Sequence, residues 1–548
     1  MMTGSTRTAL LALSLGMTIA VVPTGAQSAA TSTQIRQTAY LKASNAEKDD
    51  HFGCGGVLDG HAGYGAAVSG DGNTLVIASP HESSSATGIN GNQNDNSVYD
   101  AGAVYVFVRG GTGWVQQAYV KPSNTHDGDE FGHAVALSAD GNTLAVSAVW
   151  ESSKATGVNG DQSDHSVPQS GAVYVFTRAD GRWTQQAYIK ASNTGEAGTE
   201  TSFGDGDQFG FSLALSDDGN TLAAGAITED SNAAGINGNQ RDNSMNSSGA
   251  VYVFGRAGTT WAQQAYVKPA NPDAGDMFGY SVALNSDGNT LAVGSYDEGG
   301  SSRGINAPAD NQRRGSGAVY VFERFGTSTW SQHDYLKASN AEGGDSFGVS
   351  VALSDDGNTL LVGSLDEDCP ATGVNPPGCD NDRESDTSTG AAYVFARNNQ
   401  GVWSQQAFLK AAYVAKGDWF GNRLALSGDG NTALIGATLE DLGGQGINPR
   451  ANGKAAQESG SAYVFRRNAN TWTQFAYLKG SNTRAFDEFG SSLGISRDGR
   501  TLLITARGED SAAKGINGNQ TDGSASEAGS AYIFQIGAPT APRITTSF

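Results

Sequence analysis

A glutamate returns seven times along the chain, and each time it opens a long polar segment. The two fullest copies run from Glu229 to Ser244 and from Glu509 to Ser524, and both read Glu-Asp-Ser-x-Ala-x-Gly-Ile-Asn-Gly-Asn-Gln-x-Asp-x-Ser. Carboxylate and amide oxygens are the hard ligands that calcium prefers. The recurring glutamates are Glu82, Glu151, Glu229, Glu298, Glu367, Glu440 and Glu509.

Two hypotheses explain these segments. In the first, the carboxylates and amides tie down a long loop by accepting its backbone N–H groups. In the second, the oxygens converge on a cation, and calcium is the candidate cofactor, although the spacing is not that of an EF-hand. The candidate metal ligands are Glu229, Asp230, Asn239 and Asp242 in one loop, and Glu509, Asp510, Asn519 and Asp522 in another.

A second recurrent acid stands two residues before a Phe-Gly pair. An aspartate in this place fixes the turn that enters the following strand, or else contributes to a ring of acids around a channel mouth. Both interpretations stay open at this point. The residues are Asp129, Asp207, Asp276, Asp345, Asp418 and Asp487.

Catalytic patterns find little support. The seven histidines are scattered without the spacing of a metal or nucleophile motif, whereas paired carboxylates for glycoside chemistry remain open in so acidic a chain. Most Trp and Tyr residues recur regularly and are expected to pack inside the fold. Trp150 and Trp419 interrupt the pattern and are predicted to contact a ligand.

Two of the three cysteines, Cys369 and Cys379, lie ten positions apart in one loop. In an oxidising compartment they are expected to form a local disulfide. No histidine lies near them, so the segment does not resemble a zinc site. Cys54 is left over.

The composition indicates a turn-rich, all-β chain. It has 548 residues with 75 Gly, 38% hydrophobic residues and only 16% charged ones. The formal charge of -22 argues against nucleic acid as a partner, because phosphates are bound by basic patches. Cations, glycans and other protein surfaces are compatible partners.

The first thirty residues read as a secretory signal peptide. Arg7 precedes an apolar run from Leu10 to Val22, and small residues follow from Ala26 to Ala30. No later segment has the roughly 20 apolar residues that a spanning helix needs, so the mature chain is expected to have no membrane span. We therefore expect a secreted or cell-surface protein, or a periplasmic one.

A repeat organises the rest of the chain. The motif Ser-x-Asp-Gly-Asn-Thr-Leu recurs seven times with variations, and its aspartates follow one another at intervals of 69 to 78 residues. The aspartates are Asp71, Asp140, Asp218, Asp287, Asp356, Asp429 and Asp498.

Each copy predicts four antiparallel strands. An inner strand such as Phe278 to Asn285 leads through a tight Asp-Gly-Asn turn into Thr290 to Ser295. After a long loop come the alternating strand Ser316 to Phe322 and an outer strand that opens on Trp330. Small twisted sheets of this kind bury their faces against copies of themselves around an axis, so the prediction is a seven-bladed β-propeller of four-stranded antiparallel blades.

The two ends of the repeat indicate how the ring closes. The last copy stops at Phe534 without an outer strand, and Gln37 to Asn45 matches the outer-strand segment Gln185 to Asn193. The N-terminal strand is therefore predicted to complete the last blade, which distinguishes a closed propeller from an open solenoid. The predicted organisation is a signal peptide at 1–30, a propeller at 31–535 and a tail at 536–548.

These motifs resemble the FG-GAP repeat of the integrin α-subunit head. Phe-Gly pairs open six of the seven inner strands, as at Phe278-Gly279 and Phe347-Gly348, and Gly-Ala or Gly-Ser ends several second strands. The resemblance implies a seven-bladed propeller and a role in adhesion. Integrins carry calcium loops between the first two strands, but the Asp-Gly-Asn turn here is too short to wrap a cation.

The prediction is an exported, non-catalytic binding or adhesion module whose partner is a protein or a glycan. The working surface is expected where the long loops between second and third strands gather. Two alternatives stay open: a propeller enzyme that acts on extracellular polysaccharide, and a structural surface protein.

Overall fold

The computed structural model describes residues 34–55, 57–58, 61–62, 64–195, 206–379, 387–450 and 455–537. Every helix or strand assigned within these ranges is a β-strand, and none of these residues form an apolar helix of membrane-spanning length. The predicted signal peptide at 1–30 lies outside the described residues, as do residues 538–548 of the predicted tail.

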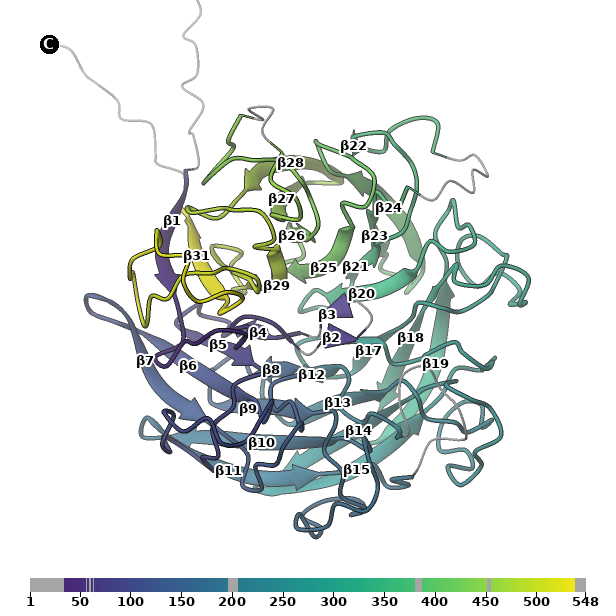
Figure 1. Cartoon of the computed structure of the whole chain (residues 1–548). Coiled ribbons are helices and arrows are strands. Elements are labelled where there is room, and N and C mark those ends of the chain that lie inside the picture. The colour runs from purple at the N-terminus through teal and green to yellow at the C-terminus, as the bar shows by residue number, and fades with distance from the viewer. Residues whose placement is uncertain are drawn as a thin grey trace, which may run out of the picture. The chain divides into compact units, whose positions relative to one another are not determined.

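The strands of Ile35–Ile536 form seven antiparallel blades arranged in a ring, which confirms the predicted propeller (Figure 1). Blade 1 contains β4 (Ala66–Val68), β5 (Thr74–Ser79), β6 (Ala103–Gly110) and β7 (Gly113–Val120). Blade 2 contains β8 (Val135–Leu137), β9 (Thr143–Ala148), β10 (Ala172–Ala179) and β11 (Arg182–Ile189). Blade 3 contains β12 (Leu213–Leu215), β13 (Thr221–Ala226), β14 (Ala250–Ala257) and β15 (Thr260–Val267).

The remaining blades follow the same order from the inner to the outer strand. Blade 4 contains β16 (Ser281–Leu284), β17 (Thr290–Ser295), β18 (Ala318–Phe325) and β19 (Thr329–Leu336). Blade 5 contains β20 (Phe347–Leu353), β21 (Thr359–Ser364), β23 (Ala391–Arg397) and β24 (Trp403–Lys410). Blade 6 contains β25 (Phe420–Leu426), β26 (Thr432–Ala437), β27 (Ser461–Asn468) and β28 (Thr471–Leu478). Blade 7 contains β29 (Phe489–Ile495), β30 (Thr501–Ala506), β31 (Ser530–Ile536) and β1 (Ile35–Leu41).

Blade 7 closes the ring with a strand from each end of the repeat region, as the sequence predicts. β1 pairs antiparallel with β31, so that Tyr40 faces Tyr532 and Leu41 faces Ala531. Tyr40 and Leu41 are fully buried. The closing strand is therefore part of the core of the last blade.

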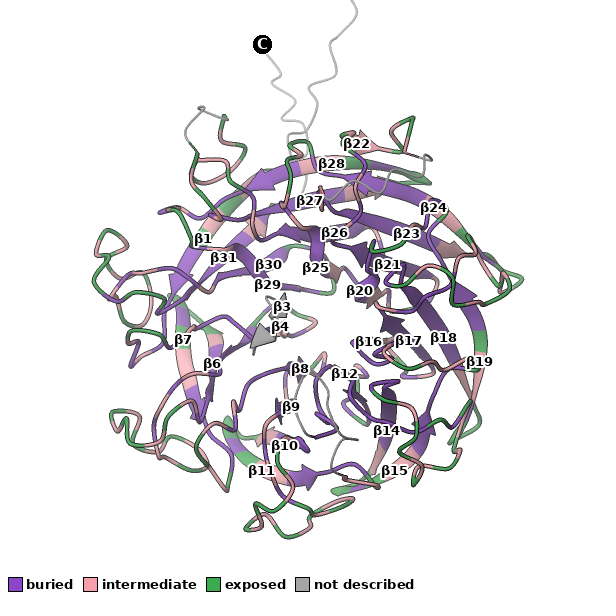
Figure 2. Ribbon diagram, turned by 45° about the vertical axis from the view of Figure 1, so that its right-hand side comes forward, coloured by how far each residue is buried: buried purple, intermediate pink, exposed green. Residues whose placement is uncertain are grey.

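The core lies between successive blades. One cluster combines Val76 and Val104 of blade 1 with Tyr174 and Phe176 of blade 2. Phe131, of the Phe-Gly pair that precedes β8, packs edge-on against both aromatic rings, at centroid distances of 5.5 and 6.0 Å. Buried residues accordingly predominate in the inner strands all around the ring, while exposed residues lie on the loops and on parts of the outer strands (Figure 2).

Two features depart from the regular pattern. Blade 5 carries a fifth strand, β22 (Gly373–Val374), which pairs with the outer strand β24. An insertion before blade 1 forms a small hairpin, β2 (Val57–Leu58) with β3 (His61–Ala62), which Figure 1 shows near the middle of the ring.

The ring closure generates a stability prediction. Leu41→Ala removes fully buried methyl groups from β1 and should lower the free energy of unfolding by about 2 to 5 kcal/mol, measured by guanidinium denaturation. The control is Arg36→Ala, at an exposed position of the same strand. Equal stability of the two variants would show that β1 does not hold blade 7 together.

Candidate functional site

Each recurring loop glutamate forms a buried ion pair with a lysine of the outer strand of its own blade. The Nζ–Oε2 distances lie between 2.6 and 3.0 Å, and each partner is at most 3% exposed. The pairs are Lys42–Glu509, Lys121–Glu82, Lys190–Glu151, Lys268–Glu229, Lys337–Glu298, Lys410–Glu367 and Lys479–Glu440. The long loop of every blade is thereby fastened to its outer strand.

An asparagine connects this ion pair to the preceding blade. Lys42 belongs to blade 7, and three residues later Asn45 donates to Glu82 of blade 1 at 3.0 Å. The Tyr105 hydroxyl of blade 1 donates to Asn45 at 2.6 Å. We call this set, the Lys–Glu pair with the linker asparagine, the interblade clamp. An asparagine donates in the same way to Glu151, Glu229, Glu367 and Glu509.

The predicted metal ligands of the third blade accept hydrogen bonds from the loop and from the outer strand. Glu229 accepts hydrogen bonds from Lys268, from the Tyr266 hydroxyl at 2.7 Å and from the Ser231 backbone N–H. Asp230 accepts the backbone N–H of Ser247 at 2.7 Å. These contacts provide the loop-fastening role of the first hypothesis.

Asn239 and Asp242 lie in exposed local turns, where each accepts a backbone N–H two residues ahead. The loop from Glu509 repeats the pattern: Asp510 accepts the Glu527 N–H, Asn519 the Thr521 N–H and Asp522 the Ser524 N–H. In the described part of the chain, no group of three or more His, Cys, Asp or Glu is arranged to hold a metal ion. Calcium binding stays a prediction that rests on oxygen chemistry alone.

The aspartates before the Phe-Gly pairs are buried turn residues. Asp276 accepts the backbone N–H of Asp273 at 3.0 Å, and Asp345 accepts that of Glu342 at 2.8 Å. Burial, followed by the charge of nearby Glu298, raises the pKa of Asp276 to about 8. Burial likewise raises the pKa of Asp129 and Asp418 to about 7 and that of Asp50, Asp345 and Asp487 to about 8.

Blade 5 breaks the repeat in the loop between β21 and β23. In four of the six other blades a serine two residues after the glutamate closes this loop, as where Ser231 Oγ donates to the Asn239 carbonyl at 2.9 Å. In blade 5 Cys369 takes the place of that serine and forms a disulfide with Cys379. The predicted disulfide is confirmed, and it replaces a hydrogen bond across the loop.

A second substitution in the same loop leaves space. Gln93 of blade 1 stands eleven residues after the clamp glutamate; its side chain accepts from Ser44 at 2.7 Å and its carbonyl from Asn45 at 2.8 Å. Gly378 holds the equivalent place in blade 5, and nothing lies within 4 Å of the position that a Cβ would take there. Without a side chain at Gly378, this position does not bridge the loop and the linker of blade 5 as Gln93 does in blade 1.

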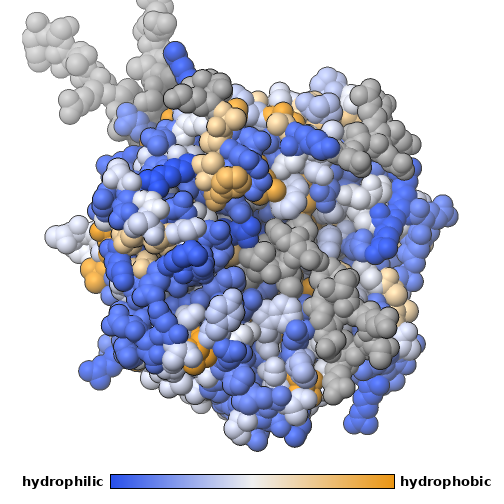
Figure 3. All heavy atoms as spheres, viewed as in Figure 1, coloured by the Kyte–Doolittle hydropathy of each residue, from blue (hydrophilic) through white to orange (hydrophobic). Residues whose placement is uncertain are grey.

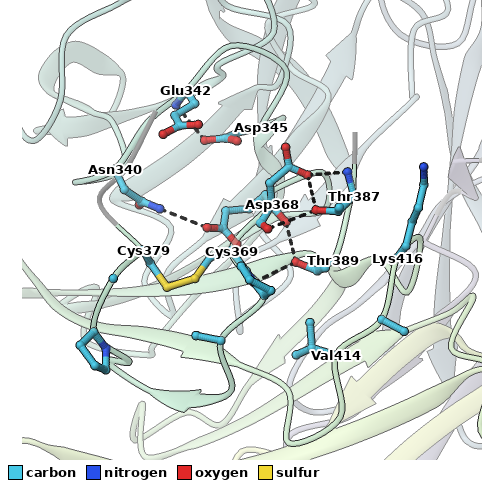
Figure 4. A pocket seen from close by; sticks show the side chains of 16 residues that line it. Asn340, Glu342, Asp345, Asp368, Cys369, Cys379, Thr387, Thr389, Val414 and Lys416 are labelled. Carbon is cyan, nitrogen blue, oxygen red and sulfur yellow. Dashed lines mark hydrogen bonds between the residues drawn. A yellow bond between two sulfur atoms is a disulfide. The ribbon is translucent and has the colours of Figure 1, made fainter. Parts of the chain in front are cut away.

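A pocket of about 540 Å³ lies at this point, between the linkers on either side of blade 5 and the disulfide loop (Figure 4). The disulfide, Pro370, Ala371 and Val414 supply apolar wall, and Lys416 is the basic residue of the lining. The acidic residues of the lining are Glu342, Asp345, Glu367 and Asp368.

Several of these polar groups are held by the scaffold. Glu367 is the clamp glutamate of this blade and pairs with Lys410. Asp368 accepts the backbone N–H groups of Thr387 and Ser388 at 2.9 and 2.8 Å. The pocket therefore has an acidic wall next to an apolar one. The face of the molecule seen in Figure 3 is largely hydrophilic with small hydrophobic patches.

Trp150 and Trp419, the predicted ligand contacts, do not line this pocket. Both are partly buried and pack against one apolar cluster that includes Phe211, Met277 and Tyr280. The structure brings the two tryptophans to the same cluster, although they lie in different blades.

Family comparison agrees with this geometry. The FG-GAP repeat model matches residues 114–176, 261–322, 330–395, 403–465 and 472–534, which together are more than half of the chain. The chain belongs to the FG-GAP repeat family. Each match in this FG-GAP propeller begins at an outer-strand tryptophan and ends in the third strand of the next blade, so it spans the linker of the interblade clamp.

Two solved structures resemble the FG-GAP propeller at low identity. A candidate 6-phosphogluconolactonase from Bacteroides uniformis has 12% identity and a TM-score of 0.42, covering 76% of this chain and 85% of its own. The periplasmic gluconolactonase of Pseudomonas aeruginosa has 15% identity and a TM-score of 0.41, covering 82% and 97%. These values are too low for either name to bear on the activity of this chain. Among curated proteins no sequence matches.

The clamp lysines and asparagines are the functional residues that sequence reasoning missed. Their signal was present, since an outer-strand Tyr-x-Lys or Phe-x-Lys ends at Lys42, Lys121, Lys190, Lys268, Lys337, Lys410 and Lys479, one for each loop glutamate. Seven lysines matched to seven buried acids indicate seven ion pairs, because a buried charge needs a partner.

Breaking one clamp should be costly. Lys268→Met leaves Glu229 buried without its counter-ion and should lower the free energy of unfolding by about 3 to 5 kcal/mol. Adding Glu229→Gln should restore part of that loss, as a double-mutant cycle followed by denaturation would measure. Lys154→Met, in an exposed ion pair with Asp164, is the control and should change little. If the double variant had a lower free energy of unfolding than Lys268→Met alone, the result would contradict the pairing.

The buried aspartates predict how stability depends on pH. The folded-state pKa of Asp276 is raised from 3.8 to about 8, so the folded protein holds this proton more tightly than the unfolded chain does. Stability should therefore fall as the pH rises from about 4 to about 8, and Asp276→Asn should become more stable relative to the wild type over that window. Denaturation at several pH values, in high salt to screen surface charge, measures the effect. Asp242→Asn is the control, because hydrogen bonds lower the pKa of that exposed carboxyl.

Proposed function

We propose that this FG-GAP propeller is an exported, non-catalytic binding or adhesion module that recognises a protein or glycan through the pocket of blade 5. The observation that carries the proposal is that the pocket arises where the repeat is broken. Cys369 and Gly378 stand where blades 1, 2, 3 and 7 have the serine and the glutamine of this loop, and Cys369 is bonded to Cys379. A disulfide then holds the altered loop in one shape.

Binding explains this arrangement better than catalysis does. Among the carboxylates of the pocket, Glu367 is paired with a lysine, and Asp345 and Asp368 accept backbone N–H groups. Such hydrogen-bonded groups shape a wall and set its charge, as a recognition site requires. Long loops carried on a rigid scaffold are also the usual place for recognition.

Export is supported by independent features. A signal-peptide pattern occupies residues 1–30, and a disulfide such as Cys369–Cys379 persists in oxidising compartments. The charge of -22 disfavours nucleic acid as the partner. We infer a secreted, cell-surface or periplasmic protein, with calcium as a candidate stabilising ion.

The test is a ligand screen with a blocked pocket. The mature protein is applied to a glycan array and used in cross-linking pull-downs of surface proteins, with and without a calcium chelator. Ala371→Trp places a bulky ring in the pocket and should reduce binding at least tenfold. Ala86→Trp puts the same ring at the equivalent loop position of blade 1 and should leave binding unchanged.

Each other outcome identifies an alternative. Equal binding by the two variants would place the ligand site elsewhere. Turnover of a polysaccharide that one carboxylate substitution abolishes would indicate the enzyme. Absence of any ligand, with a folded protein, would favour a structural surface protein.

A further inference from the structure

An arginine stands at an inner-strand position where other blades have a small residue. Arg423 lies on β25, three residues after Phe420, and is only 2% exposed. Serine occupies the equivalent position in four blades and alanine in one: Ser212, Ser281, Ser350, Ser492 and Ala134. Ser281 and Ser350 donate to a glycine carbonyl of the next blade, so the position points between inner strands.

The guanidinium of Arg423 uses only one of its nitrogens. Nη1 donates to the carbonyl and the side-chain oxygen of Asn422, at 2.8 and 2.9 Å. Nε and Nη2 have no hydrogen-bond partner in the described part of the chain, and both are shielded from solvent. A buried charge without a counter-ion is strongly unfavourable.

The free edge of Arg423 has a defined geometry. In an arginine, Nε–H and the adjacent Nη2–H point the same way and match the two oxygens of one carboxylate. Arg507 in blade 7 uses this same edge: its Nε and Nη2 donate to the two carboxylate oxygens of Glu488 at 2.6 and 2.8 Å. Arg423 presents the same pair of donors, and no carboxylate of the described residues accepts from them.

The surroundings of Arg423 retain a positive charge. The guanidinium carbon lies 5.4 Å from the centroid of the Tyr64 ring. Tyr64 and its neighbour also meet two other blades, since the Val135 N–H donates to the Tyr64 carbonyl at 2.9 Å and the Gly65 N–H to Ser492 at 3.1 Å. Among the described residues Arg423 therefore has an aromatic neighbour and no carboxylate partner, whereas Arg507 is balanced by Glu488.

We propose that the Nε–Nη2 edge of Arg423 is a binding site for a small carboxylate ligand inside the ring. The paired, unpartnered donors select a planar two-oxygen anion, and the low exposure of the side chain restricts the ligand to a small one. This site is separate from the pocket of blade 5 and does not depend on its function.

Acetate is a suitable probe, and acetamide is its neutral counterpart. Titration of the full-length mature protein with acetate, at constant ionic strength, should shift the ¹H–¹⁵N signal of Arg423 Nε and raise the melting temperature, both saturably. Acetamide should do neither.

Arg423→Ser installs the residue of the equivalent positions and should weaken acetate binding at least tenfold. Arg423→Lys should bind at intermediate strength, because an ammonium lacks the two-donor fork. Arg36→Ser, an exposed arginine with the same loss of charge, should bind acetate as the wild type does.

Several results would overturn the assignment. If acetate does not shift the Arg423 Nε signal, then water accepts the hydrogen bonds of Nε–H and Nη2–H and the assignment is wrong. An acetate response that survives in Arg423→Ser would place the anion elsewhere, and a tighter response to sulfate would exclude the carboxylate. If Arg423→Ser does not fold, the Nε titration of the wild type decides alone.

Discussion

The buried Lys–Glu pair is the interaction on which the architecture depends. A blade of four short strands cannot by itself position a loop of about twenty residues, because ordering each residue costs entropy. The lysine at the end of the outer strand reaches the first residue of that loop and fixes it where the loop begins. The asparagine that follows in the linker then contacts the glutamate of the next blade, so loop order and blade order are set by one network.

Much of the fold could be predicted because its signals are local or periodic. The Asp-Gly-Asn turns, the alternating third strands and the tryptophans of the outer strands each specify a strand or turn from neighbouring residues, and their repetition gives the blades. Ring closure followed from the match between Gln37–Asn45 and other outer-strand segments. The disulfide was predictable because its two cysteines lie in one short loop.

The clamp and the pocket were harder to predict from the sequence than the blades, for different reasons. Lys268 and Glu229 are 39 residues apart, and their contact exists only once the loop has folded back on the outer strand. The pocket depends on the small size of Gly378, which lacks the side chain that Gln93 places between linker and loop in blade 1. Its volume is enclosed by the disulfide loop and the two linkers on either side of blade 5 together. The sequence shows Arg423 as an exception to the repeat. It does not show that Nε and Nη2 of this arginine have no hydrogen-bond partner among the described residues. For the pocket and for Arg423 the repeated scaffold makes the exception interpretable, since four other blades carry glutamine at the position of Gly378 and four carry serine at the position of Arg423.

The closing strand has a consequence for how the molecule is made. Thr38 donates a hydrogen bond to the Ile533 carbonyl, 495 residues further along the chain. A polypeptide that emerges in order from a ribosome or a translocation pore offers β1 first, and its partner β31 last. Until then β1 is an unpaired strand with apolar residues, and the growing stack of blades has two open edges that invite aggregation. Completion of the circle is therefore a late, long-range event, and a cell that makes this protein must keep both edges apart from other chains while synthesis finishes.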